Sequence, residues 1–455
     1  MSLDLGGLSA PVSTIDELVA YIAAAERPAD RWLIGVEHEK IGVRGPTLEA
    51  VPYHGPHGIR ELLDAIARSA GGTQHKHKEN GQPIALLSRD ASVTLEPGGQ
   101  LELSGAPSRS FAIIEQEITD HLAEVRKDSD GLRWLAAGYR PFGTRDDGHW
   151  MPKGRYAAMK ASLGPRARLA LDMMLMTATV QANLDWSDEQ DLAEKVRAAT
   201  AVSPIVTALF ANSPLIDGRE CGYLDFRYQV WRETDPARCG LLEQMLRPGW
   251  GYRTYVEWAL DVPMLFVRHG TEYRDARQQT FRSWLNTGAL AGGEKAQPTL
   301  SNWVDHLTTL FPEVRVKRVL EVRGADVVPP PLMMSLPAVW VGLLYDPDAR
   351  RAAAELTAKW SFAGLVDFQG EVARHALQAR GPDGSTALEL ARQVLRIARQ
   401  GLKGWERSSG FDESAHLDPL DEIADSGRTL AERVLEAYRT SGGEPQSVVK
   451  LWQIA

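Results

Sequence analysis

The stretch of residues 95–105 limits the possible folds of this chain more than any other. It reads Leu-Glu-Pro-Gly-Gly-Gln-Leu-Glu-Leu-Ser-Gly, so Gln100 and Glu102 alternate with leucines. Successive side chains of an extended strand point to opposite faces. We therefore expect the two polar groups on one face and the leucines packed behind them. The Pro-Gly-Gly after Glu96 breaks the alternation, which leaves open whether Glu96 joins the polar face.

Two further stretches repeat this design. Glu37 and Glu39 alternate within one apolar run, and Glu321 lies two residues before Arg323 in another. Carboxylates on one strand face repel each other unless cations lie among them, and Mg²⁺ or Mn²⁺ prefer such oxygen ligands and bridge them to phosphates. A single Glu-x-Glu is usually a solvated face. Three such patterns flanked by apolar runs favour a metal–phosphate site.

Composition limits the binding partners and the cellular compartment that we expect for this chain. The chain has 455 residues, a formal charge of −9 and two cysteines, Cys221 and Cys239. An acidic protein does not attract nucleic acid or an anionic membrane, and two distant cysteines fit neither a zinc site nor a disulfide framework. We find no signal-peptide pattern at the N-terminus and no run near 18 apolar residues. We therefore expect a cytoplasmic protein.

Periodicity and turn signals predict alternating helices and strands, followed by helices alone. Residues 71–82, which contain His75 and His77, are expected to form an exposed turn, with metal binding as the less favoured reading. If residues 315–326 form one regular strand, Arg315, Lys317, Glu321 and Arg323 share a face. The predicted helices are residues 14–25, 58–69, 111–127, 188–209, 303–311 and most of 349–438; the predicted strands are 32–43, 84–88, 91–95, 132–138 and 177–183.

If a nucleotide binds to this chain, cationic side chains and metal ions must hold its phosphates. There is no glycine-rich phosphate loop, and no serine or cysteine nucleophile motif. The cationic candidates are Arg155, Arg227, Lys317 and Arg323. Residues 177–183 alternate neutral hydrogen-bonding groups with small apolar ones, which suits a polar organic ligand.

Eight different motifs follow one another along the chain in an order typical of one family. They occupy residues 35–40, 95–107, 151–156 (Met-Pro-Lys-Gly-Arg-Tyr), 171–174 with 179–185, 207–214, 259–264 (Ala-Leu-Asp-Val-Pro-Met), 306–326 and 340–346. Together they resemble the plant-type and proteobacterial glutamate–cysteine ligases, which are glutamine-synthetase-like carboxylate–amine ligases. The resemblance covers about residues 31–346 and is weaker beyond.

The resemblance implies an α+β fold with a curved, mainly antiparallel sheet flanked by helices and a helical C-terminal part. It implies a catalytic core at residues 1–348, with 349–455 packed on the same unit. The implied reaction is ATP-dependent ligation of the glutamate γ-carboxylate to the amine of L-cysteine through γ-glutamyl phosphate, the first step of glutathione synthesis. The implied substrates are L-glutamate, L-cysteine and ATP, with Mg²⁺ or Mn²⁺ as cofactor, in a monomer or weak homodimer.

The resemblance also implies roles for individual residues. The metal ligands would be Glu37, Glu39, Glu96, Glu102 and Glu321, with Gln100; the phosphate-facing catalytic cations would be Arg323 and Lys317; the glutamate-binding residues would be Arg155, Arg227, Thr179, Val180, Gln181 and Asn183; and the amine pocket would include Tyr255 and Trp258.

Two alternatives remain open: a γ-glutamyl ligase for another amine, and a non-catalytic glutamate or nucleotide sensor on the same fold. The regulatory cysteines of the plant members align with Ala276 and Ser335 here, so we expect no plant-style disulfide switch.

Overall fold

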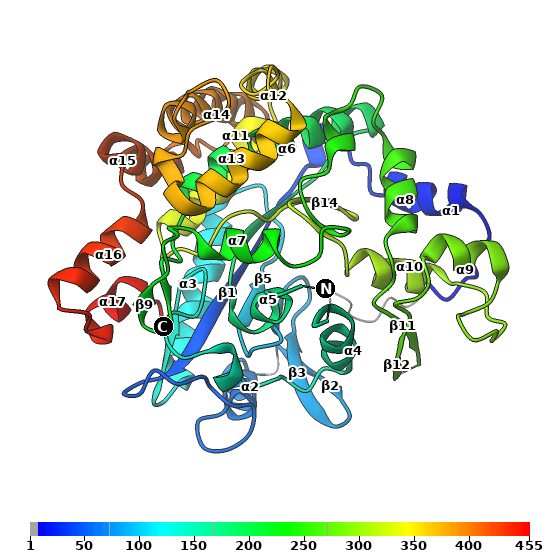
Figure 1. Ribbon diagram of the computed structural model, residues 1–455, viewed down its shortest axis with the longest axis horizontal. Coiled ribbons are helices and arrows are strands. Elements are labelled where there is room, and N and C mark those ends of the chain that lie inside the picture. The colour runs from blue at the N-terminus through cyan, green and yellow to red at the C-terminus, as the bar shows by residue number, and fades with distance from the viewer. Residues whose placement is uncertain (1–7, 72, 166, 271) are drawn as a thin grey trace.

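A large antiparallel sheet forms the centre of the molecule (Figure 1). The computed structural model describes residues 8–71, 73–165, 167–270 and 272–455. Within them the strand order is β14-β15-β7-β1-β5-β4-β3-β2, and β6 pairs with the second half of β1. The strands of this sheet are β1 (Ile34–Arg44), β2 (His75–Glu79), β3 (Gln82–Leu87), β4 (Ser92–Leu95), β5 (Leu101–Ser104), β6 (Leu132–Leu135), β7 (Val180–Leu184), β14 (Val314–Val316) and β15 (Leu320–Val322).

Three short strand pairs lie outside the sheet, and helices surround it. The pairs are β8 (Leu215–Ile216) with β9 (Arg219–Glu220), β10 (Cys239–Gly240) with β13 (Phe311–Pro312), and β11 (Phe266–His269) with β12 (Glu272–Asp275). The α-helices are α1 (Ile15–Ala23), α2 (Ile59–Ser69), α3 (Phe111–Asp128), α4 (Gly154–Leu163), α5 (Ala170–Met176), α6 (Glu189–Leu209), α7 (Phe226–Arg232), α8 (Tyr252–Asp261), α9 (Phe281–Thr287), α10 (Leu300–Leu307), α11 (Leu332–Leu344), α12 (Pro347–Glu355), α13 (Phe362–His375), α14 (Ala387–Ser409), α15 (Asp418–Ser426), α16 (Leu430–Thr440) and α17 (Pro445–Trp452). The predicted α+β class with a mainly antiparallel sheet is confirmed.

Residues 92–104 form the hairpin β4–β5, and the predicted alternation is confirmed. Leu101 and Leu103 are buried, whereas Glu102 faces the opposite side. The turn between the strands packs closely on α5, because a Cβ at Gly98 would lie 2.3 Å from the carbonyl oxygen of Leu175. A side chain larger than hydrogen therefore cannot be placed at Gly98 without moving α5.

Two local expectations are wrong. Residues 314–322 form a hairpin rather than one strand, with Arg315 paired opposite Glu321. Residues 75–79 form the edge strand β2 instead of an exposed turn, and Asn80 and Gly81, both with positive φ, connect it to β3. Two-residue turns of this conformation match the twist of paired strands, which explains why a polar segment forms a strand here.

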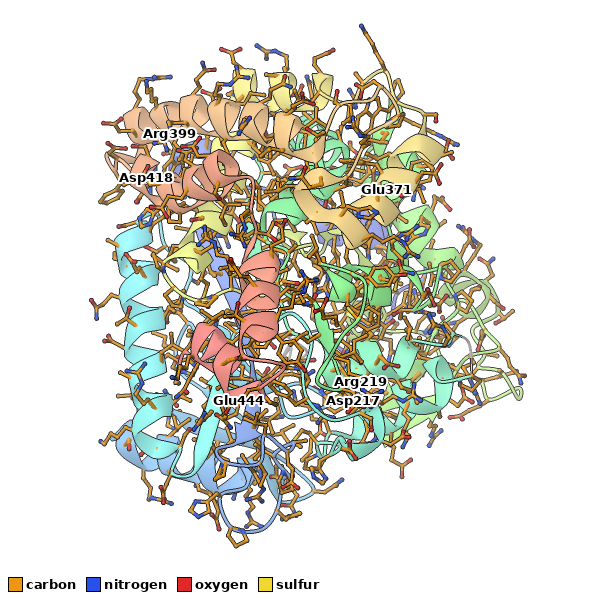
Figure 2. The ribbon with its side chains drawn as sticks, turned by 60° about the vertical axis from the view of Figure 1, so that its left-hand side comes forward. Asp217, Arg219, Glu371, Arg399, Asp418 and Glu444 are labelled. Atoms are coloured by element: carbon orange, nitrogen blue, oxygen red, sulfur yellow. The ribbon has the colours of Figure 1, made fainter. Side chains whose placement is uncertain are left out.

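The C-terminal helices pack directly on the core. A Cβ at Gly401 of α14 would lie 1.7 Å from the carbonyl oxygen of Gly342 in α11, so the two helices touch backbone to backbone. Arg399 of α14 binds Asp418 of α15 at 2.9 Å (Figure 2). The predicted helical character of residues 349–438 is confirmed, and the division at residue 348 stays a prediction. None of the described helices is long and apolar enough to span a membrane.

Candidate active site

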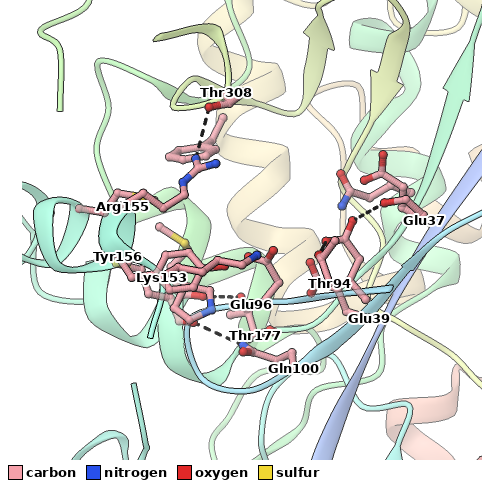
Figure 3. Close-up of a pocket in the computed structure, with 18 of the residues that line it drawn as sticks. Glu37, Glu39, Thr94, Glu96, Gln100, Lys153, Arg155, Tyr156, Thr177 and Thr308 are labelled. Atoms are coloured by element: carbon pink, nitrogen blue, oxygen red, sulfur yellow. Dashed lines mark hydrogen bonds between the residues drawn. The ribbon is translucent and has the colours of Figure 1, made fainter. Parts of the chain in front are cut away.

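A cavity lies over the polar face of the sheet, and half of the predicted site residues line it. Because β1 lies between β7 and β5, the backbone register sets Glu39 opposite Glu102, and Glu102 opposite Thr94 on β4. Figure 3 shows Glu37, Glu39 and Thr94 on one side of the cavity and Arg155 on the other. The predicted residues that line it are Glu37, Glu39, Glu96, Gln100, Glu102, Arg155, Gln181 and Arg323.

The carboxylates of β1 accept hydrogen bonds from neutral groups of the described chain. Glu39 accepts a hydrogen bond from the Thr179 backbone N–H at 3.0 Å, and Glu37 accepts one from Asn183 Nδ2 at 3.0 Å. Burial, followed by repulsion from Glu96 and Glu102, raises the pKa of Glu39 well above its usual range. Burial, followed by repulsion from neighbouring carboxylates, also raises the pKa of Glu37.

The donor set fits a hard divalent cation. The cavity offers carboxylate and hydroxyl oxygens, which Mg²⁺ and Mn²⁺ prefer, and raised carboxyl pKa values mark a site that a cation would stabilise. In the described part of the chain, no three acidic, histidine or cysteine side chains already converge on one point as a formed metal centre. An ion here would therefore need small side-chain movements.

Glu321 has the opposite environment. Its carboxylate is fully buried, and it contacts Arg315 at 2.5 Å, Lys317 at 2.6 Å and also Arg323. Burial alone would raise the pKa of Glu321, but these three cations hold it well below its usual range. Arg323 also donates to Gln181 Oε1 at 2.7 Å. The β14–β15 hairpin thus gathers three cations around one acid at the end of the cavity.

The first turn of α4 adds a second cationic group. Arg155 reaches across the cavity and donates to Thr308 Oγ1 at 3.3 Å (Figure 3). Lys153, which sequence reasoning missed, donates to the carbonyl oxygen of Leu95 at 2.6 Å, and Tyr156 donates to the same atom at 2.5 Å. Burial lowers the pKa of Lys153. The signal was present in the Met-Pro-Lys-Gly-Arg-Tyr motif, where Lys153 lies two residues before Arg155.

Other lining residues carry no sequence signal of their own. They come from segments far apart in the chain, and include Glu79, Thr94, Tyr273, Thr308 and Trp231. Only the folded chain brings them together.

Gln100 lines the cavity but its amide is already occupied. Its Oε1 accepts from the Gly98 N–H at 2.9 Å, and its Nε2 donates to the carbonyl oxygen of Thr177 at 2.8 Å. These bonds fix the turn after Glu96, and so hold Glu96 in the cavity wall. The contacts favour a positioning role over metal ligation.

Several predicted residues lie outside the cavity. Arg227 is buried and donates both Nη groups to backbone carbonyls, those of Gly324 at 2.9 Å and Arg323 at 3.0 Å. The hydroxyl of the buried Tyr255 accepts from the Val316 N–H at 3.2 Å. Trp258 lines a separate surface groove. The other predicted residues that are absent from the cavity wall are Lys317, Glu321, Thr179, Val180 and Asn183.

The two cysteines are free. Cys239 is buried, and the Cys221 thiol lies 3.5 Å from the carbonyl oxygen of Tyr223. Ala276 and Ser335, at the positions of the plant regulatory cysteines, are both buried.

Comparison with a solved structure first shows the fold. The crystal structure of glutamate–cysteine ligase from Francisella tularensis in complex with AMP superposes with a TM-score of 0.57 at 13% identity, covering 92% of this chain and 87% of that one. This likeness shows the fold, which is that of the glutamine-synthetase-like ligases.

Sequence comparison then gives the family. The chloroplastic glutamate–cysteine ligase of Arabidopsis thaliana is 40% identical over 433 residues, which is 95% of this chain and 81% of that protein. The Brassica juncea enzyme is 40% identical over 442 residues, 97% of this chain and 84% of that protein. The model of glutamate–cysteine ligase family 2 matches residues 33–450. The chain belongs to this family.

Proposed function

We propose that this chain joins the γ-carboxylate of L-glutamate to the amine of L-cysteine with hydrolysis of ATP, giving γ-glutamylcysteine. Beyond family membership, one observation carries the proposal: the carboxylates Glu39 and Glu102 and the cations Arg315 and Arg323 line one cavity, and burial with carboxylate repulsion raises the pKa of Glu39 in spite of nearby Arg323. Such a site can bring an anionic carboxylate and an anionic phosphate together, because each charge has a partner of opposite sign.

The carboxylate wall would hold Mg²⁺ or Mn²⁺. The proposed ligands are Glu37, Glu39, Glu96 and Glu102, joined by Glu321 once phosphates bind. When bound, the metal would neutralise phosphate charge and orient the transferred group.

We propose a second role for Glu321, which is to bind cationic side chains until the phosphates of ATP replace it. In the absence of phosphate it binds Arg315, Lys317 and Arg323. Phosphate oxygens are strong acceptors for guanidinium groups. ATP binding would therefore draw these cations from Glu321 to the phosphates, and would release the carboxylate toward the metal.

The glutamate would bind at the opposite end. Arg155, with its Nε atom lacking a partner in the described structure, and Lys153 present two cations for a substrate carboxylate. Gln181 offers its amide from β7. The predicted roles of Thr179 and Asn183 would be indirect, because these residues donate hydrogen bonds to Glu39 and Glu37 and so position those carboxylates.

Two displacements complete the proposed chemistry. A γ-carboxylate oxygen of glutamate attacks the γ-phosphorus of ATP, and the bond to the ADP oxygen breaks. The amine nitrogen then attacks the acyl carbon, phosphate leaves, and the nitrogen loses a proton. In both steps Arg323 and Arg315 would stabilise charge on the phosphoryl oxygens.

A reducing compartment such as the cytoplasm is part of the proposal. It is supported by two free cysteines, one of them buried. The plant relatives named above are chloroplastic, so the compartment differs among family members.

The deciding experiment is an amine screen. ADP release would be measured with ATP, Mg²⁺ and glutamate, alone and with each of cysteine, other amino acids and simple amines, and the products identified by mass. We expect turnover with cysteine at least about tenfold above any other amine. Turnover with a different amine would replace cysteine as substrate, and binding of glutamate without ADP release under any condition would leave the sensor alternative.

A further inference from the structure

The reverse face of the sheet carries a second cavity, separate from the candidate active site. It is a groove of 670 Å³ between α3 and strands β3, β4 and β5. Leu86, Val93 and Leu103 form its floor. Leu103 and Val93 flank Glu102 and Thr94 in sequence, so the groove lies directly behind the carboxylate wall. Its volume is within the range of small-molecule sites.

The α3 wall of the groove is acidic, and Lys127, outside the groove, only partly opposes the raised pKa of Glu124. Glu117, Asp120 and Glu124 line it, and no lysine or arginine does. The hydrogen bonds to this wall come from neutral groups of the described chain: Glu117 accepts from the Ala106 N–H at 2.9 Å and Asp120 from Gln116 Nε2 at 2.8 Å. Burial raises the pKa of Glu117, and burial followed by repulsion from Asp128 raises that of Glu124. A bound cation would relieve this cost.

A buried and unpartnered histidine faces the same groove. His121 is only 5% exposed, lines the groove, and its Nε2 atom has no hydrogen-bond partner in the described structure. Buried polar atoms nearly always have partners, so this atom indicates a missing ligand or water. At the lip of the groove Ile113 is 62% exposed, the largest exposure among the large apolar side chains described.

The spacing of the carboxylates suggests the shape of the ligand. Glu117, Asp120 and Glu124 are separated by three and four residues, which in a helix corresponds to rises of about 4.5 and about 6 Å. Linear polyamines with three- and four-carbon spacers separate their nitrogens by about 5 and about 6 Å. Their methylene segments would cover the apolar floor.

We propose that this groove binds a linear aliphatic polyamine, with successive ammonium groups on Glu117, Asp120 and Glu124. An anion would be repelled by the wall. A single metal ion would leave the apolar floor uncovered, and no three of the described carboxylates converge on one point.

The test is a calorimetric titration of the full chain with spermidine at physiological ionic strength and saturating Mg²⁺. We expect one saturable site, with putrescine binding at least about fivefold more weakly because it spans only part of the wall. Asp120→Asn and Glu124→Gln should each weaken spermidine binding at least about threefold. The matched control is Glu115→Gln, which removes one charge from the same helix outside the groove and should change binding less than about twofold.

Two further variants separate the groove from other acidic sites. Ala112→Trp adds bulk at an exposed lining position and should abolish binding, while thermal unfolding checks that the variant is folded. Glu102→Gln, in the candidate active site, should bind spermidine normally. Absence of saturable binding, equal weakening by Glu115→Gln, or loss of binding in Glu102→Gln would overturn the proposal. None of these outcomes bears on ligase turnover, so the proposed function is tested separately.

Discussion

The partly buried acids of β1 and the buried Glu321 of β15 lie on either side of strand β7, and their charges are balanced in opposite ways. In the described part of the chain, Glu37 and Glu39 of β1 accept hydrogen bonds from neutral groups and repel neighbouring carboxylates. On β15, Glu321 contacts three cations. The pKa values of the first group stay raised although cations of the chain lie nearby, so a bound cation would stabilise it further. The cations around Glu321 could instead bind an anionic ligand. A site that must hold both metal and phosphates needs both kinds of group.

The largest expected effect on stability follows from removing the Glu321 carboxylate, which the three cations contact. Glu321→Gln leaves three cations facing a neutral amide in a buried position, and breaking a buried ion pair costs about 3–5 kcal/mol. We expect the free energy of unfolding, measured by urea denaturation, to fall by about 3 kcal/mol. Arg323 would also lose its orientation, so activity should be lost. A variant as stable as the wild type would show that solvent already screens this cluster.

Glu39 of β1 and its cross-strand neighbour Glu102 of β5 should respond in the opposite way. Glu39→Gln and Glu102→Gln each remove a charge from a repelling set, so stability without metal should stay equal or rise. Activity should fall about 100-fold or more at saturating Mg²⁺, because an amide is a weaker ligand for a hard cation. Parallel kinetics and thermal unfolding measure both quantities, with Glu115→Gln as a control. Near wild-type turnover in both variants would remove these residues from the site.

These contrasts show which parts of the site the sequence could reveal. Strand alternation alone places Glu37, Glu39 and Glu102 on one face, since the neighbouring apolar residues must be buried. The turn between Lys317 and Val319 has no glycine, proline or asparagine, so the hairpin that pairs Arg315 with Glu321 carries no turn signal.

Long-range packing accounts for the remaining errors. Arg227 and Tyr255 occur beside the right motifs, but both side chains bond to backbone atoms of residues 316–324. Strand β2 has polar residues on both faces because it is an edge strand, and so lacks the alternation that identifies a half-buried strand. The places of these two side chains and of β2 therefore depend on contacts with residues far away in the sequence.

A smaller effect distinguishes the two ends of the cavity. Arg155→Lys keeps the charge but loses the planar pair of donors that suits a carboxylate. We expect the KM for glutamate to rise about tenfold and that for ATP less than twofold. Arg168→Lys, an exposed change outside the cavity, is the matched control. A change confined to ATP would assign Arg155 to the phosphate end.

The smallest effect concerns how the β1 charges depend on pH. An unfolded glutamate loses its proton near pH 4.3, whereas folded Glu39 keeps it to higher pH because burial and then Glu96 and Glu102 raise its pKa. The folded state therefore binds more protons in this window, and stability from Glu39 falls as pH rises through the folded pKa. Buried histidines and lysines titrate too, but they are common to the wild type and Glu39→Gln. In EDTA, the stability advantage of Glu39→Gln should accordingly grow as the pH rises above the unfolded glutamate pKa. Saturating Mg²⁺ should remove that growth, since a bound cation stabilises the charged carboxylate. An advantage that is constant with pH, or unaffected by Mg²⁺, would mean that Glu39 is already compensated within the chain and does not differ from Glu321 as we infer.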